Sequence, residues 1–185
     1  MKLKKSLNIM GAICLTAVIG GTSVCALAAE AKTAPAAATQ TETLSLLNGR
    51  QTFQLRGYEV QPVPGGGPGK MYVNKLEKRV VIIGEEAIPA ITQGASDADF
   101  LDGMKSIKDK QMQASPSYKV ISEKTENAKG LPVYHIEATN KMGGNDVQQA
   151  TLLAVAEKKL TVIQVISNHK DKSGHLKAVN NSLGK

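Results

Sequence analysis

The alternation of apolar and polar residues indicates a chain that is rich in β-strands from Leu44 onward. Phe53 and Leu55 alternate with polar residues after the turn dipeptide Asn48-Gly49, which predicts a tight turn followed by a strand. The four consecutive β-branched residues at 80–83 are typical of a central strand that is covered on both faces. We therefore predict strands over residues 51–55, 71–74, 79–84, 119–126, 131–140, 147–157 and 160–167.

Helical spacing is found in two segments. Ser96 precedes acidic residues in an N-cap pattern, and apolar positions then recur every three or four residues up to Gln111, which predicts a helix that ends before Pro116. A second helix should begin near Ser173 and bury Leu176, Val179 and Leu183. Short turns at 143–145 and 157–159 favour antiparallel neighbours. The expected fold class is therefore α+β, an antiparallel β-sheet with helices packed on it.

Two connections, 56–69 and 85–95, are longer than the roughly 4 to 6 residues that usually join elements, and such loops are often functional. The first contains three prolines and four glycines between residues 62 and 69, which no helix or central strand accommodates. Both loops flank the same apolar strands. We expect a partner to contact their apolar residues, Val63, Pro64, Ile88 and Ile91. In the alternative, the two isoleucines pack into the core and the glycines are a spacer.

The N-terminal segment has the features of a secretory signal peptide. Three lysines precede an apolar run over 9–19, and Ala26-Leu27-Ala28 offers small residues to a signal peptidase. The run is shorter than the ~20 residues that span a membrane, which argues against a retained anchor. We predict a signal peptide over 1–28, a flexible Ala/Thr/Pro/Gln linker over 29–43 and one domain over 44–185. The mature protein would be periplasmic or otherwise extracytoplasmic.

Both cysteines lie in the predicted signal peptide, so the mature chain would have no disulfide and no thiol nucleophile. Cys25 leaves open a lipoprotein alternative, in which cleavage precedes a lipid-modified cysteine. Thr22-Ser23-Val24 matches the usual pattern before such a cysteine poorly. We therefore expect membrane contact only if Cys25 is lipidated.

The charge of the chain does not indicate a nucleic-acid partner. The whole sequence has 23 basic and 16 acidic residues; removal of residues 1–28 takes away three lysines and lowers the net charge from +7 to +4. The remaining lysines are spread along the chain among acidic residues, which is typical of an ordinary solvated surface.

No motif in the sequence predicts catalysis, a cofactor or a metal. The spacing at Gly65 to Lys70 does not match a phosphate-binding loop, and the carboxylates from Asp97 do not match a calcium loop. The three histidines lack zinc-ligand spacing and are interpreted as surface or partly packed residues: His135, His169 and His175. No nucleophile elbow is present, and three serines are interpreted as caps or loop residues: Ser96, Ser167 and Ser173.

The order of short motifs resembles the DcrB family of enterobacterial envelope proteins over nearly all of 44–185. The matching features are Leu46 to Arg50 with Phe53 and Leu55, Met71-Tyr72-Val73, Val80 to Gly84, the helix through Leu101 and Gln111, Pro116, Val120, Gly130, and the closing strand pair and helix. The resemblance implies a Mog1/PsbP-like fold, with helices on both faces of an antiparallel sheet, and a non-enzymatic envelope role. It carries over no catalytic residue. DcrB itself is a lipoprotein, and the sequence before Cys25 departs from that pattern.

The sequence thus predicts a non-enzymatic accessory module of the bacterial cell envelope that binds other envelope proteins. Two alternatives remain open. A carrier of a lipid or other apolar ligand would show a closed apolar cavity with few polar groups. A hydrolase would place one of the three histidines within hydrogen-bond reach of a serine and a carboxylate.

Overall fold

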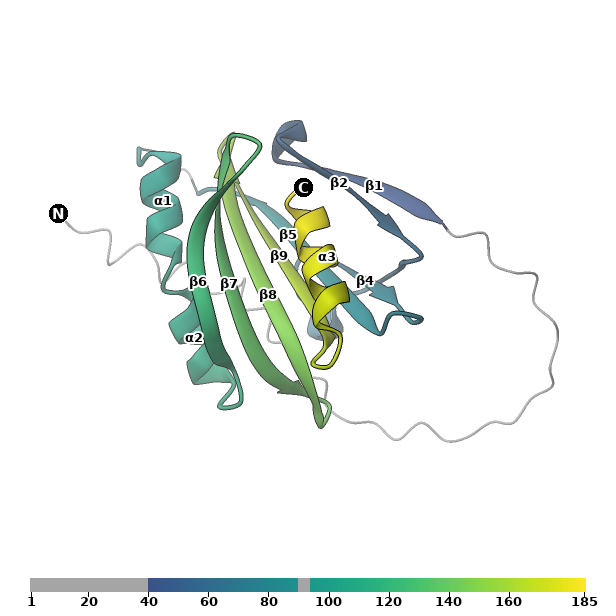
Figure 1. Ribbon diagram of the computed structural model, residues 1–185. Coiled ribbons are helices and arrows are strands. Elements are labelled where there is room, and N and C mark those ends of the chain that lie inside the picture. The colour runs from purple at the N-terminus through teal and green to yellow at the C-terminus, as the bar shows by residue number, and fades with distance from the viewer. Residues whose placement is uncertain (1–39, 90–93) are drawn as a thin grey trace, which may run out of the picture.

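The computed structural model describes residues 40–89 and 94–185, and its main element in that part of the chain is a seven-stranded sheet. The strand order is β3-β4-β5-β9-β8-β7-β6, and every neighbouring pair is antiparallel (Figure 1). The strands are β3 Glu59–Gln61, β4 Lys70–Asn74, β5 Arg79–Ala87, β6 Lys119–Ala128, β7 Leu131–Met142, β8 Asn145–Ala156 and β9 Lys159–Asn168. The predicted fold class, α+β with an antiparallel sheet, is confirmed.

A separate hairpin precedes the sheet. It pairs β1 Thr41–Leu46 with β2 Gln51–Arg56, joined by a short 3₁₀ turn at Leu47–Gly49, as the Asn-Gly dipeptide predicts. Asn48 and Gly49 both have positive φ angles, 53° and 89°, which these two residue types accept most readily. Strand β1 starts at Thr41, within the segment 29–43 that was assigned to the linker.

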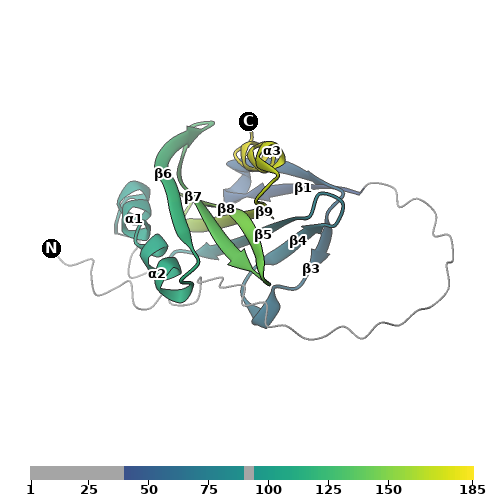
Figure 2. The same cartoon turned by 60° about the horizontal axis from the view of Figure 1, so that its bottom comes forward.

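Helices lie on both faces of the sheet (Figure 2). On one face, α3 Lys172–Ser182 and the β1–β2 hairpin cover an apolar cluster that includes Phe53, Val81, Val133 and Ile163. On the other face, α1 Asp97–Met104 and α2 Ile107–Ala114 cover a second cluster that includes Phe100, Tyr134, Leu153 and Val162. No helix among the described residues has the length and apolar character needed to cross a membrane.

The predicted helix at 96–114 is two helices with a break at Lys105 and Ser106. Its predicted start is confirmed, because the Ser96 hydroxyl oxygen accepts a hydrogen bond from the Asp99 backbone N–H at 3.2 Å. Gly103 weakens the middle of the segment, and the Ser106 hydroxyl donates to the Gly103 carbonyl at 3.3 Å. Such a local side-chain bond competes with the regular helical pattern.

The two predicted long loops are shorter than expected. Strand β3, which was not predicted, occupies residues 59–61 of the first loop. Strand β5 continues to Ala87 and so takes up the start of the second loop. In α3 the predicted apolar face is only partly correct: Val179 and Leu183 are buried, but Leu176 is exposed and His175 is buried in its stead.

Candidate functional site

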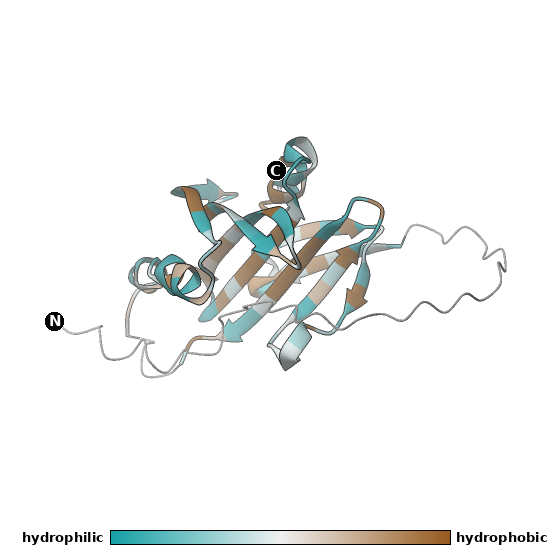
Figure 3. Cartoon of the chain, turned by 90° about the horizontal axis from the view of Figure 1, so that it is seen from below, coloured by the Kyte–Doolittle hydropathy of each residue, from teal (hydrophilic) through white to brown (hydrophobic). Residues whose placement is uncertain are grey.

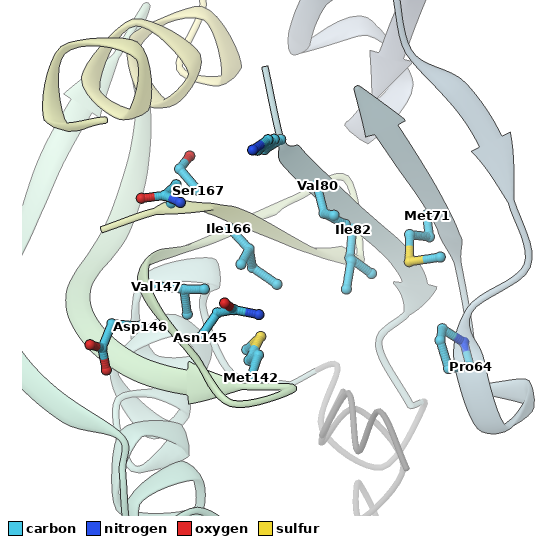
Figure 4. Close-up of a pocket in the computed structure, with 12 residues that line it drawn as sticks. Pro64, Met71, Val80, Ile82, Met142, Asn145, Asp146, Val147, Ile166 and Ser167 are labelled. Carbon is cyan, nitrogen blue, oxygen red and sulfur yellow. The ribbon is translucent and has the colours of Figure 1, made fainter. Parts of the chain in front are cut away.

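Helices α1 and α2 leave part of their face of the sheet without a helical cover. The apolar cluster beneath them is formed by β7, β8 and β9, whereas β4, β5 and the end of β9 form a third, smaller cluster. A pocket of about 400 Å³ lies over these strands (Figure 4). We call it the apolar groove; its apolar lining comes from six strand residues, Met71, Val80, Ile82, Met142, Val147 and Ile166.

The register of the strands explains how these side chains come together. Val80 is paired with Ile166, and Met71 with Ile82, so they form two rows on one face of the sheet. Viewed from this side, hydrophobic residues are concentrated in the central strands (Figure 3). β5 is an inner strand, as predicted, but its cover is incomplete on this face because Val80 remains partly exposed.

One end of the apolar groove is polar. Lys78, Asn145, Asp146 and Asn168 line it where β5 and β8 begin and β9 ends, and all four are exposed. Asp146 lies 3.9 Å from the Lys141 ammonium, a distant and exposed pair. The site therefore joins an apolar floor to an open rim of amide, ammonium and carboxylate groups, an arrangement that suits binding better than chemistry.

The structure separates the four predicted contact residues. Val63 packs against Ile82 and Ile166, and exposed Pro64 lines the apolar groove, so the first loop contributes to the site. Ile88 is 6% exposed and packs in the cluster beneath α1. Ile88 is therefore a core residue, as in the alternative to a partner contact. Ile91 lies outside the described residues. The strand residues of the groove were missed because a half-covered strand face has the same pattern as a core face.

Two histidines that were interpreted as surface or partly packed residues are buried, and that interpretation is wrong for them. His135 and His175 are 5% and 4% exposed, and they belong to a connected series of polar side chains beneath α3. This histidine chain runs from Glu126 through His135, Glu137 and His175 to Ser167. His169, the third histidine, is exposed.

The geometry assigns a charge to His135. Its Nδ1 lies 2.7 Å from Glu126 and its Nε2 lies 2.6 Å from Glu137, so both nitrogens must donate and the ring is an imidazolium. Burial would lower the pKa of His135, but the hydrogen bonds to Glu137 and Glu126 outweigh burial and raise it. Burial acts on Glu137 in the opposite sense, and its bonds to His135 and His175 lower the pKa to about 2.

His175 meets the geometric condition that was set for a hydrolase. Its Nδ1 lies 3.0 Å from the Ser167 hydroxyl, and its Nε2 lies 3.1 Å from Glu137. However, Ser167 is 1% exposed, and its oxygen accepts a hydrogen bond from Arg79 Nε at 3.2 Å. Ser167 lines the end of the apolar groove, but its hydroxyl points to α3, on the side of β9 opposite to Ile166 (Figure 4). A substrate carbonyl has no approach to this oxygen, which a nucleophile requires.

Arg79, which donates to Ser167 of the histidine chain, also holds α3 against the sheet. Asp171, the N-cap of α3, accepts bonds from the Gly174 backbone N–H at 2.9 Å and from Arg79 NH2 at 2.7 Å. Gly174 leaves room for this contact, because a Cβ there would lie 2.2 Å from the Arg79 guanidinium. The Ser-His-Glu arrangement is therefore best explained as packing of α3. In the described residues, no three or more His, Asp or Glu side chains are grouped to hold a metal ion.

Comparisons with known proteins identify the fold. No protein-family model matches the chain, and no curated protein matches it in sequence. The solution structure of a cyanobacterial PsbP from Synechocystis superposes with a TM-score of 0.54 at 14% identity, covering 83% of this chain and 95% of that chain. This chain has a PsbP-like fold. The identity is too low to transfer a function.

Two other solved structures are more distant. A putative regulator of unknown function from Pseudomonas aeruginosa matches with a TM-score of 0.44 at 14% identity, over 76% of this chain and 91% of its own. LpqN of Mycobacterium tuberculosis, which is involved in cell envelope biogenesis, matches with a TM-score of 0.46 at 9% identity, over 80% of this chain and 82% of its own.

Proposed function

We propose that this chain is an exported, non-enzymatic accessory module of the bacterial cell envelope that binds an apolar segment of another envelope protein in the apolar groove. The single observation that carries the proposal is the uncovered strip over β4, β5 and β9. The signal-peptide pattern and the resemblance to the DcrB family support the envelope location. The inaccessible Ser167 hydroxyl is the reason to prefer binding over hydrolysis.

The chemistry of the rim favours a peptide as the occupant. A bound peptide brings backbone N–H and C=O groups that need hydrogen-bond partners once they leave water. Lys78, Asn145, Asp146 and Asn168 offer donors and acceptors beside the apolar floor. A pure acyl chain would use none of these groups along its length. The predicted partner is thus an apolar segment with accessible backbone, held by side chains in the groove and by polar groups at its end.

Site-specific photocrosslinking in the native host tests this function. A benzophenone side chain at Met71 should give a discrete protein adduct, and the additional change Val147→Asp should reduce it at least tenfold. The matched control is the same probe at Ile121, which is 66% exposed on β6, away from the groove. If Met71 and Ile121 give the same adducts, the groove is not a docking site.

A carrier of an apolar small ligand is the second candidate. The pocket volume of about 400 Å³ favours it, because ligand pockets commonly measure roughly 300 to 1,000 Å³. In the same crosslinking experiment, a carrier would gain the mass of a lipid at Met71 and no protein adduct. Native mass spectrometry of the purified protein would then show a bound amphiphile that Val147→Asp releases.

Export is tested separately by the intact mass of the protein from its native host. We expect an unlipidated chain that starts at Ala29, because Ala26-Leu27-Ala28 fits the peptidase. A lipid on Cys25 would keep the envelope location but replace the soluble form by a membrane-anchored one. An intact N-terminus at Met1 would contradict export.

A further inference from the structure

A second pocket, of about 320 Å³, lies on the opposite face of the sheet from the apolar groove, between β2, β5 and α3. Its lining is mostly polar and includes three cations, Arg56, Arg79 and Lys177. Glu77 is the one carboxylate among its lining residues, so the formal charge of the lining is +2. We call it the cationic pocket.

The three cations differ in how their charges are balanced. The Arg79 guanidinium is buried and ion-paired to Glu77 and Asp171. The Arg56 guanidinium makes only a 3.5 Å hydrogen bond to the Gln54 amide oxygen, which neutralises no charge. Within the part of the chain that the structure describes, the Lys177 ammonium forms no hydrogen bond or ion pair. Two of the three cations in the cavity thus have no ion-pair partner among the described residues.

Neutral donors complete the lining. Tyr58 is half-buried beside Arg79, and burial raises the pKa of its hydroxyl, so it stays a proton donor at neutral pH. Asn181 is held in place because its amide donates to the Gln54 carbonyl at 2.7 Å. Arg79 is fixed at the back by Asp171 and Ser167. These contacts organise the walls of the pocket before any ligand arrives.

We propose that the cationic pocket binds a phosphate group, either as a free phosphate compound or as a lipid headgroup. Arg56 and Lys177 have no ion-pair partner, and a phosphate monoester, which carries about −1.5 to −2 at pH 7, can contact both with separate oxygens. Guanidinium and ammonium groups are also the side chains that recognise phosphate oxygens best. This site is independent of the apolar groove, which lies across the sheet.

Glu77 should oppose anion binding in the cationic pocket. The Glu77 carboxylate accepts a hydrogen bond from Arg79 Nη1, so this N–H is not available to a ligand. Its negative charge also repels an incoming anion. Glu77 is half-exposed, so Glu77→Gln alters little of the fold. Removal of this charge should strengthen phosphate binding, an effect that no general loss of stability could imitate.

The test is calorimetric titration of the mature protein with inorganic phosphate at low ionic strength. We expect Arg56→Gln with Lys177→Gln to weaken binding at least tenfold and Glu77→Gln to strengthen it about threefold or more. The matched control, Arg50→Gln with Lys172→Gln, removes the same charge from two exposed residues outside the pocket and should leave affinity within twofold.

A second arm uses vesicles of phosphatidylcholine with or without phosphatidic acid. Binding that needs phosphatidic acid and is lost in the Arg56/Lys177 variant identifies a lipid headgroup, whereas titratable inorganic phosphate identifies a free ligand. The proposal is overturned if neither probe binds, if the control pair weakens binding as much as the pocket pair, or if Glu77→Gln weakens it.

Discussion

The two faces of the sheet differ in how completely their apolar strands are covered. On the α3 face, a helix and a hairpin close over the core, and the polar groups at its edge are buried and paired through His135, Glu137 and His175. On the other face, two short helices cover only β7, β8 and part of β9, and the remaining strip stays open as the apolar groove. The serine, histidines and glutamates therefore lie beneath α3, on the face where a helix and a hairpin cover the core.

This difference shows that burial, not residue identity, decides what a cluster can do. A serine, a histidine and a glutamate lie in hydrogen-bond contact on the α3 face, yet the Ser167 hydroxyl is buried and bonded to both Arg79 Nε and His175 Nδ1. The groove is open, and its partly exposed methionines and valines remain free to exchange water for a partner. We expect stability to depend on the histidine chain and binding of the protein partner to depend on the apolar groove.

The largest effect should follow Glu137→Ala. The change leaves the His135 imidazolium with one carboxylate and the His175 N–H without its acceptor, and loss of one partner of a buried pair costs about 3 kcal/mol or more. Urea denaturation measures the free energy of unfolding. Glu157→Ala, which removes an exposed pair with Arg50 at 3.7 Å, should cost less than about 0.5 kcal/mol. Equal losses in the two variants would mean that the histidine chain stabilises the fold no more than an exposed ion pair does.

Ser167→Ala should come next, with a loss of about 1 to 2 kcal/mol, because Arg79 Nε and His175 Nδ1 both lose a buried partner. The wild-type protein should not react with a fluorophosphonate probe, since the hydroxyl is inaccessible. Covalent labelling at Ser167 that disappears in the alanine variant would restore the hydrolase hypothesis.

A charge in the apolar groove should give the reverse pattern. Val147→Asp should lower the free energy of unfolding by less than about 1 kcal/mol, because Val147 is partly exposed, while partner binding falls at least tenfold, or about 1.4 kcal/mol. Ile121→Asp on β6 is the matched control. A variant that unfolds, or that binds normally, would remove the contrast between the two faces.

Stability should also show a pH dependence that belongs to the α3 face. The raised pKa of His135 gives stability that is complete below 6.5 and is lost as pH rises through the folded value. Glu126 and Glu137, whose pKa values are lowered to about 2, give stability that is complete above 4.5 and is lost as pH falls towards 2. Stability should therefore be greatest between about pH 4.5 and 6.5.

The control for this profile is His135→Gln. Glutamine keeps a hydrogen bond but has no charge to lose, so the alkaline decline should flatten while the acid decline remains. Lys124 and Lys185 also pair with Glu126. An unchanged alkaline decline would assign it to another group.

Local patterns were sufficient for most of the secondary structure. The turn at Asn48-Gly49, the β-branched run of β5 and the cap at Ser96 each depend on residues that are neighbours in the sequence, and all three lie where they were predicted. The antiparallel sheet followed from short turns between apolar strands. Strand β3 was missed because three residues with one apolar position are too short to give a pattern, and they are defined as a strand by their pairing with β4.

The sites, in contrast, were decided by tertiary structure. Val80 and Ile166 are 86 positions apart in the sequence, and only strand pairing places them side by side in the groove. His175 was interpreted as a surface or partly packed residue because the sequence around it shows no ligand spacing; the fold supplied Glu137 and Ser167 from two strands. Sequence determines which faces are apolar, because that depends on neighbours along the chain. Whether a helix then covers such a face depends on segments far apart, and that alone separates a core from a groove.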